Sequence, residues 1–487
     1  MGGIWSKETN DTKQEVAATE GVATVETLGC LEEKPGEKRK NTGKDDRPKG
    51  KRVKTASQRK EHFEKKGSWK AKEKEAWGVK REVDPNQPKE PRYPKKKVAL
   101  LIGFCGTGYQ GMQMNKDAKT IEGALFDAMV KVGAISKANS EDASKINWMR
   151  TARTDKGVHA ACNVVSCKMA FPVEDMTPLI NAELPEQIRV WNYVQTARSF
   201  HAKVACDSRI YEYLLPSYAF APPKKYILTT EPTSDTDVMV SGDNGQTKRY
   251  VARSTAEELA TLDSYRIDQD TLERFREALS MFVGTHNFHN YTIGRSPTDN
   301  SSNRYIMSIK VDDPIYINGC EWLSVKLQGQ SFMLHQIRKM VSMAILTVRS
   351  KTPLKIIKNS FDNVRINIPK APAVGLLLER PVFDSFNKSL QMKDATFNAV
   401  REPVEFHPYK DEIEAFKQKW IYSTIFAAEA VERGFDTFLR TVDAHFGHEF
   451  NYLNSDGEIP DECIVYTKFS GQTKKKDDSE DEIGAEE

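Results

Sequence analysis

The sequence RTDKGVHA at residues 153–160 places a single carboxylate, that of Asp155, in a loop with an arginine, a threonine and a glycine. The loop precedes an apolar segment at 163–169 that is typical of a strand. An aspartate in this position could simply form a turn. A carboxylate in an arginine-rich, glycine-hinged loop is more typical of a nucleophile or an acid–base group. Arg150 and Arg153 flank Asp155, so we expect the pKa of its carboxyl to be low.

The composition is that of a globular intracellular protein. The chain has 487 residues, which is enough for a sizeable core, and its formal net charge is only +3. Seven cysteines occur without a CxxC pair, a pattern that favours reduced and mostly buried thiols. No apolar run is long enough to span a bilayer, so we do not expect a membrane protein.

Both ends of the chain are predicted to be disordered. Residues 1–95 form an arm rich in charged and small polar residues, which cannot bury enough apolar surface to fold. Two basic clusters in this arm, at 38–40 and 49–54, look like a bipartite nuclear import signal or a phosphate-binding arm. A solvated run of charges is the simpler alternative. We expect a nuclear protein with an acidic, disordered tail at 466–487.

Between these ends the pattern predicts two similar halves, at 96–215 and 261–390, separated by an insertion loop at 216–260. Each half combines strands with amphipathic helices, including one helix at 270–283 and one that starts at Ser331 and runs to 349. A helical extension follows at 391–465. This content predicts an α+β sheet built from two related halves, with helices on one side.

The run GTGYQG at 106–111 matches a dinucleotide-binding fingerprint, but its context does not. In that fold the helix starts at the third glycine and an acidic residue ends the next strand. Here the helix is expected only after Thr120, about nine residues later. The glycines therefore predict a tight turn or a place where an RNA backbone approaches closely.

Three further sites carry candidate chemistry. Arg338 lies at the edge of the apolar face of its helix and needs a partner, for which Asp155 is our candidate; an arginine reaching solvent is the alternative. Tyr211 is either a cross-strand aromatic or a side chain that stacks on a base. The run at 286–290 holds two histidines without a third ligand nearby, so a loop that contacts RNA or the active site is favoured over a metal site.

Five runs together resemble the pseudouridine synthases of the TruA type. They are GTGYQGMQ at 106–113, RTDKGVHA at 153–160, SRIYEY at 208–213, GQSFMLHQIR at 329–338 and AVGLLLE at 373–379. The resemblance covers about residues 92–390. It implies the pseudouridine synthase fold, in which two related halves form one mixed, largely antiparallel sheet flanked by helices around a central RNA-binding cleft.

The resemblance also implies roles for individual residues. Asp155 would be the essential catalytic group, acting as a nucleophile or in proton abstraction. Tyr211 would stack on the uracil and take part in proton transfer, and Arg338 would form an ion pair with Asp155. Arg153 would help to displace the target base from its stack. Further substrate contacts are expected from Arg150, Thr154, Gly157, His159, Tyr109, Gln113, His286, Asn287 and Leu376.

The implied activity is isomerisation of uridine to pseudouridine at several positions in tRNA, and also in snRNA and mRNA. The reaction needs no cofactor, and a bound zinc ion has little support from the sequence. Bacterial relatives are homodimers, but the C-terminal extension could cover that interface, so we expect a monomer. A non-catalytic tRNA-binding protein or RNA chaperone on the same fold is the alternative, although such a protein would be expected to lack Asp155.

Overall fold

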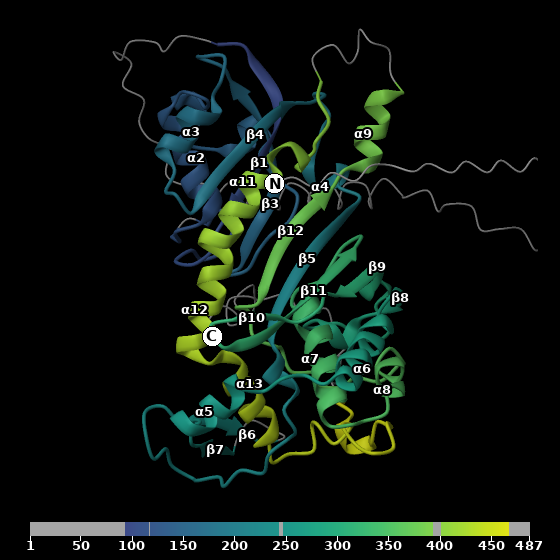
Figure 1. Cartoon of the computed structure of the whole chain (residues 1–487). Coiled ribbons are helices and arrows are strands. Elements are labelled where there is room, and N and C mark those ends of the chain that lie inside the picture. The colour runs from purple at the N-terminus through teal and green to yellow at the C-terminus, as the bar shows by residue number, and fades with distance from the viewer. Residues whose placement is uncertain (1–92, 116, 243–246, 393–400, 467–487) are drawn as a thin grey trace, which may run out of the picture. The chain divides into compact units, whose positions relative to one another are not determined.

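A ten-stranded sheet, antiparallel in all but one of its pairings, forms the centre of the protein (Figure 1). The computed structural model describes residues 93–115, 117–242, 247–392 and 401–466. These residues belong to one compact unit, Glu64–Glu487. The expected basic clusters, almost all of the N-terminal arm and nearly the whole acidic tail lie outside the described residues.

The sheet joins two groups of strands through β12 (Leu376–Val382). The strand order is β4-β1-β3-β12-β5-β11-β9-β8, with β2 added to β3 and β10 added to β11. The other strands are β1 Lys95–Phe104, β2 Met149–Arg150, β3 His159–Ala170, β4 Ile188–Gln195, β5 Ser208–Pro216, β8 Gly284–Asn287, β9 Asn303–Val311, β10 Ile315–Ile317 and β11 Cys320–Gly329. β12 belongs to the second predicted half, but it lies between two strands of the first, parallel to β3 and antiparallel to β5, so the two predicted halves share a single mixed sheet.

Both faces of the sheet are covered, because its central strands are apolar on both sides. In β1, Val98 and Leu100 belong to a buried cluster with α2 (Ile121–Lys131), whereas the intervening Ala99 and Leu101 pack with the C-terminal helices. Successive side chains of a strand point to opposite faces, so a continuous apolar run requires two covers. The α+β prediction is confirmed, but helices lie on both faces and not on one.

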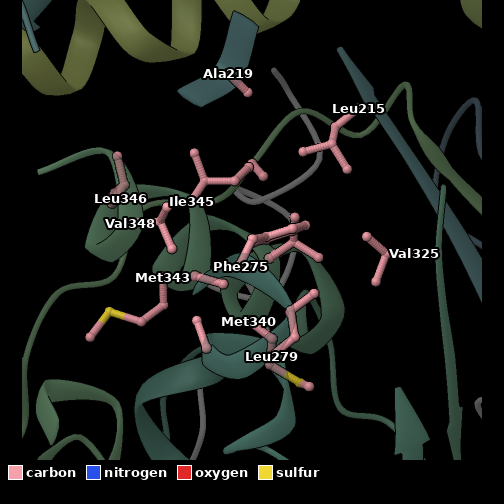
Figure 2. Close-up of a cluster of buried hydrophobic side chains, with 14 of the residues drawn as sticks. Leu215, Ala219, Phe275, Leu279, Val325, Met340, Met343, Ile345, Leu346 and Val348 are labelled. Carbon is pink, nitrogen blue, oxygen red and sulfur yellow. The ribbon is translucent and has the colours of Figure 1, made fainter. Parts of the chain in front are cut away.

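In the second half, α6 (Gln269–Ser280) and α7 (Gln336–Arg349) pack against β5 and β11. Figure 2 shows the cluster that joins them, with Phe275 of α6, Met340 of α7 and Val325 of β11 facing a common interior. The helix predicted from Ser331 begins five residues later, at Gln336. Residues 331–335 form a loop instead, whose end is held by a hydrogen bond from the Met333 amide to Gln336 Oε1 (2.9 Å).

The segment expected to be an insertion loop contains regular structure. Its strands β6 (Val238–Ser241) and β7 (Lys248–Val251) form a small antiparallel sheet, and α5 (Ala256–Asp263) follows, with a capping box at Thr255. These elements are too short to give a clear periodicity, which is why composition pointed to a loop.

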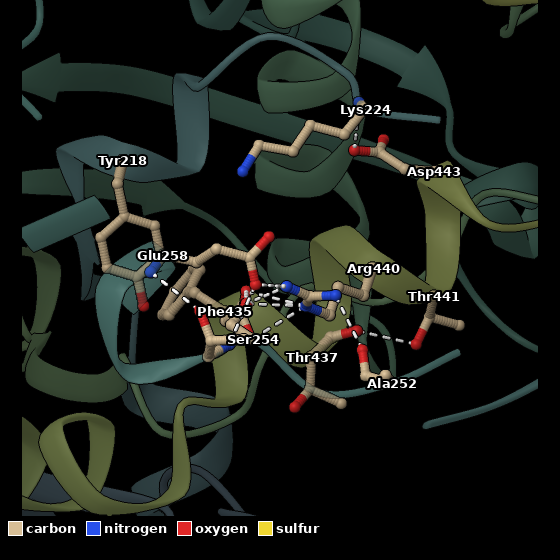
Figure 3. Close-up of polar contacts among 12 residues, drawn as sticks. Tyr218, Lys224, Ala252, Ser254, Glu258, Phe435, Thr437, Arg440, Thr441 and Asp443 are labelled. Carbon is tan, nitrogen blue, oxygen red and sulfur yellow. Dashed lines mark hydrogen bonds and ion pairs between the residues drawn. The ribbon is translucent and has the colours of Figure 1, made fainter. Parts of the chain in front are cut away.

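Arg440 of α13 (Gly434–Asp443) holds this insertion in place (Figure 3). Its side chain is 3% exposed, and its guanidinium donates to the Ala252 carbonyl (2.8 Å) and to Ser254 Oγ (2.7 Å). It also pairs with Glu258 (3.1 Å) and Asp436 (3.3 Å). A buried guanidinium with this many acceptors ties the insertion to the C-terminal extension.

The part of the extension before α13 packs on the face of the sheet opposite α6 and α7. It runs through α11 (Lys410–Phe416), a π-helical turn at Lys417–Tyr422 and α12 (Ser423–Glu432), in agreement with the helical prediction. Lys417 is buried between Glu379 of β12 (2.8 Å) and Glu212 of β5 (3.5 Å), while the Tyr422 hydroxyl donates to Glu212 (2.7 Å).

We predict that Arg440→Ala destabilises the protein by about 3 kcal/mol, because it leaves Asp436 buried without its cation. Denaturant unfolding should measure this loss, and limited proteolysis should cut the insertion faster. Arg295→Ala is the matched control, since Arg295 and Asp299 form an exposed pair whose loss should cost less than about 1 kcal/mol. Equal effects of the two substitutions would contradict the anchoring role.

Candidate active site

The loop that carries Asp155 is fixed at both ends by β-structure. It leaves β2, which pairs with β3, and re-enters β3 at His159. Gly157 has φ +75°, a conformation that favours glycine, and the Val158 amide donates to the Asp155 carbonyl (3.1 Å) to close the turn. The carboxylate therefore stands on a short, defined turn, with its side chain 48% exposed.

The glycine-rich loop after β1 packs against this turn. The Met112 amide donates to the Thr154 carbonyl (3.2 Å), and the Gly106 amide donates to His159 Nδ1 (3.2 Å). A Cβ added at Gly106 would lie 2.3 Å from the Val158 carbonyl oxygen, and one at Gly111 would lie 2.8 Å from that of Thr154. We expected these glycines to form a tight turn or to let an RNA backbone approach. In the structure, Gly106 and Gly111 are required because two protein loops pack closely there.

His159 lies beneath the loop and not on its surface. It is 2% exposed, and burial lowers the pKa of its imidazole to about 4. The ring is therefore neutral at physiological pH, as its acceptance of the Gly106 hydrogen bond requires. The structure places it where it can join the two loops.

Tyr211 reaches the same region from β5. Its ring lies edge-to-face with Phe332 of the 331–335 loop, at 5.2 Å between centroids. Burial raises the pKa of Tyr211 to about 12, and the charge of Asp155 acts in the same direction. The phenol is therefore protonated at neutral pH, so it is suited to stacking and hydrogen-bond donation, and would have to give up its own proton before acting as a base.

The electrostatics of Asp155 differ from our expectation. Its pKa is raised, because partial desolvation of this half-exposed carboxyl outweighs the lowering by Arg338 and Lys370. The prediction that Arg150 and Arg153 keep this pKa low is wrong: Arg150 Nε donates instead to Glu122 (2.5 Å), a fully buried carboxylate on α2. Arg153 is exposed. A charge that flanks another in sequence need not face it in space.

Arg338 lies on the first turn of α7, and its positive charge lowers the pKa of Asp155. Its Nε donates to the Ala371 carbonyl (2.7 Å), just upstream of β12. The structure thus brings Arg338 near Asp155 and fixes its orientation through the backbone. A direct ion pair between the two side chains stays a prediction.

The remaining predicted residues fall into two groups. Tyr109 and Thr154 are buried around the two loops, Gln113 is exposed beside them, and Leu376 begins β12 opposite Tyr213. His286 and Asn287 are on β8, at the far edge of the sheet from β3.

The two edge-strand side chains have local partners. The His286 ring stacks on Phe361, with 4.4 Å between centroids, and Asn287 donates to the Pro297 carbonyl (2.5 Å). Among the residues that the structure describes, no group of three or more His, Cys, Asp or Glu side chains could hold a metal ion.

Comparisons with known proteins agree with this arrangement. A family model described as tRNA pseudouridine synthase matches residues 278–384. The tRNA pseudouridine synthase 1 of Yarrowia lipolytica is 42% identical over 452 residues, covering 82% of this chain and 84% of the relative. The chain belongs to the tRNA pseudouridine synthase family. The Saccharomyces cerevisiae synthase is 40% identical over 67% of both chains, and the mouse pseudouridylate synthase 1 homolog is 34% identical over 77% of this chain and 80% of the relative.

Sequence reasoning missed two polar residues beside Asp155 of this synthase. His335 Nδ1 lies 3.8 Å from Asp155 Oδ2, and the charge of Lys370 acts on both side chains. His335 was absorbed into a predicted helix, and Lys370 is a lone lysine in a segment without periodicity. For His335 the available signal was a polar residue after an apolar run, three positions before Arg338.

We predict that Gly111→Ala lowers both stability and activity more than Gly108→Ala does. Both glycines have positive φ, +96° and +82°, so alanine is strained at either position. Only at Gly111 would the new Cβ also push on the Asp155 loop, whereas at Gly108 nothing lies within 4 Å. Melting temperature and kcat on tRNA should separate the two, with a kcat loss of about tenfold or more for Gly111→Ala alone. Equal losses would mean that the close approach is unimportant.

We predict that Arg338→Gln moves the acidic limb of the pH–activity profile to higher pH. We expect Asp155 to act as a carboxylate, so activity should be lost as the pH falls through its pKa, and removing a positive charge that lowers this pKa raises it further. Arg338→Lys keeps the charge and should leave the limb in place even if kcat falls. The measurement is kcat/KM as a function of pH. If the acidic limb of Arg338→Gln stays where it is in the wild type, Arg338 does not influence the ionisation of Asp155.

Proposed function

We propose that this chain isomerises uridine to pseudouridine in tRNA, with Asp155 as the catalytic carboxylate. The N1 glycosidic bond breaks, the uracil turns, and a new bond forms between C5 and C1′. The C5 proton is lost and N1 gains a proton, so the reaction is balanced without water or a redox partner. The observation that carries this proposal is a half-exposed carboxylate beside Tyr211, Arg338 and His335 in a chain of this family.

The proposed roles follow from the positions of the side chains. Asp155 attacks C1′ or removes a proton from C2′, and its charge is supported by Arg338 and Lys370. Tyr211 stacks on the uracil as a neutral phenol, with Phe332 supporting its ring. Arg153, exposed on the Asp155 loop, helps to hold the target base outside its stack, which otherwise costs a few kcal/mol.

The substrate range and the cell location are further proposals. We expect several uridines in tRNA to be modified, and uridines in snRNA and mRNA as well, which sequencing for pseudouridine after depletion of the protein would test. The basic clusters at 38–40 and 49–54 support a nuclear location. A tagged protein with both clusters changed to alanine should lose that location.

The assembly and cofactor proposals rest on the fold and the chemistry. We expect a monomer, since the C-terminal helices cover one face of the sheet, and sedimentation would test it. The chemistry calls for no cofactor, so activity should survive treatment with a chelator. Loss of activity after that treatment would mean that a zinc ion is required. No helix among the described residues is long and apolar enough to cross a membrane.

We predict that Asp155→Asn abolishes pseudouridine formation on an unmodified tRNA transcript, by at least about a thousand-fold, while tRNA binding is kept. The variant keeps the shape of the side chain and removes its charge. Asp313→Asn is the matched control, because that carboxylate is 92% exposed and remote from the site in the sheet. Product from Asp155→Asn at the wild-type rate would place the chemistry elsewhere. Binding without product from any variant, wild type included, would favour a non-catalytic RNA-binding protein.

A further inference from the structure

His335 is held in an unusual conformation directly beside Asp155. It has φ +60° and ψ +5°, the left-handed region, at the residue before α7. Non-glycine residues rarely adopt this conformation unless the surroundings impose it, and such residues gather at functional sites. The conformation aims the imidazole at the Asp155 loop, with the side chain 11% exposed.

Two polar atoms, one on His335 and one on the Asp155 loop, lack hydrogen-bond partners among the described residues. One is His335 Nδ1 and the other is Thr154 Oγ1, on the residue preceding Asp155; both are buried. The distance of 3.8 Å from His335 Nδ1 to Asp155 Oδ2 is too long for a direct hydrogen bond. It suits a hydroxyl that lies between the two groups, because one oxygen can be about 2.8 Å from both atoms at this separation.

The imidazole has the protonation state for such a contact. Burial lowers the pKa of His335 to about 4, and the charges of Lys370, Arg338 and Lys339 act in the same direction. At neutral pH the ring therefore carries one N–H and one lone pair, so it can donate to a hydroxyl or accept from it.

We propose that His335 recognises the ribose 2′-hydroxyl of the target uridine, and so makes the enzyme specific for a ribonucleotide at the reacting position. This inference rests on the proposed function. Asp155 acts on C1′ or C2′, and the 2′-oxygen is bonded to C2′ and adjacent to C1′. A carboxylate placed at either carbon would bring that oxygen close to Asp155, where His335 Nδ1 lies 3.8 Å from the carboxylate. The 2′-hydroxyl is the group by which proteins distinguish RNA from DNA.

The test is a cycle of two enzymes and two substrates under single-turnover conditions. The substrates are a tRNA with uridine at the target position and the same tRNA with 2′-deoxyuridine there. The enzymes are the wild type and His335→Ala. Removal of the 2′-hydroxyl also changes the intrinsic strength of the glycosidic bond, but this change is the same for both enzymes and cancels in the cycle.

We expect the deoxy substitution to slow the wild type by about tenfold more than it slows His335→Ala. His335→Asn should recover part of this difference, since asparagine tolerates the left-handed conformation and places a polar atom near the position of Nδ1. Melting temperature and tRNA affinity, measured for each variant, confirm that the fold and the complex are intact.

Two results would overturn the proposal. If His335→Ala slows both substrates by the same factor, the residue supports the site without contacting the 2′-hydroxyl. If it only shifts the acidic limb of the pH profile, it acts on the ionisation of Asp155. Failure of the proposed function looks different, because then the wild type forms no Asp155-dependent product from the uridine substrate at all.

Discussion

The pairing of β12 with two partners is the constraint on which the active site depends. Along β12, Leu377 and Leu378 lie opposite His159 and Ala160 of β3 on one side, and opposite Glu212 and Tyr211 of β5 on the other. One strand therefore separates the start of β3, where the Asp155 loop ends, from Tyr211. Neighbouring strands are about 4.8 Å apart, so the start of β3 and Tyr211 are held roughly 10 Å from each other. That spacing is set by the backbone hydrogen bonds that β12 makes with both strands.

The segment leading into β12 also fixes α7, the helix that carries Arg338. The Ala371 carbonyl accepts from Arg338, and the Pro372 carbonyl accepts from Tyr213 (2.6 Å). A Cβ on Gly375 would lie 2.0 Å from the Leu214 carbonyl oxygen, so this approach to β5 requires glycine. One short stretch thus positions α7, β5 and β3 relative to one another. The charges around Asp155 depend on the same geometry, because Arg338 and Lys370 lower its pKa against the effect of burial.

The sequence predicted the parts whose signal is local. The strand expected at 163–169 and the helix expected at 270–283 follow from local apolar patterns, and the structure confirms them as β3 and α6. The parallel pairing of β12 with β3 joins residues more than two hundred positions apart, and no local pattern reveals it. For the site, Asp155 and Tyr211 were singled out as candidates through motifs. His335 was not, since a left-handed residue before a helix cannot be distinguished by periodicity from the helix itself.

On the face of the sheet opposite α6 and α7, the contacts of Glu212 help to fix the position of β5. Glu212 is adjacent to Tyr211, but its side chain points to the other face, where it contacts Tyr422 and Lys417 and accepts from Ser324 Oγ (2.7 Å). Burying these charges gives little net stability, yet removing one partner leaves the others unpaired at high cost. The π-helical turn at Lys417–Tyr422 supplies both contacts from one segment. The C-terminal extension therefore supports, from the opposite face of the sheet, the strand that carries Tyr211.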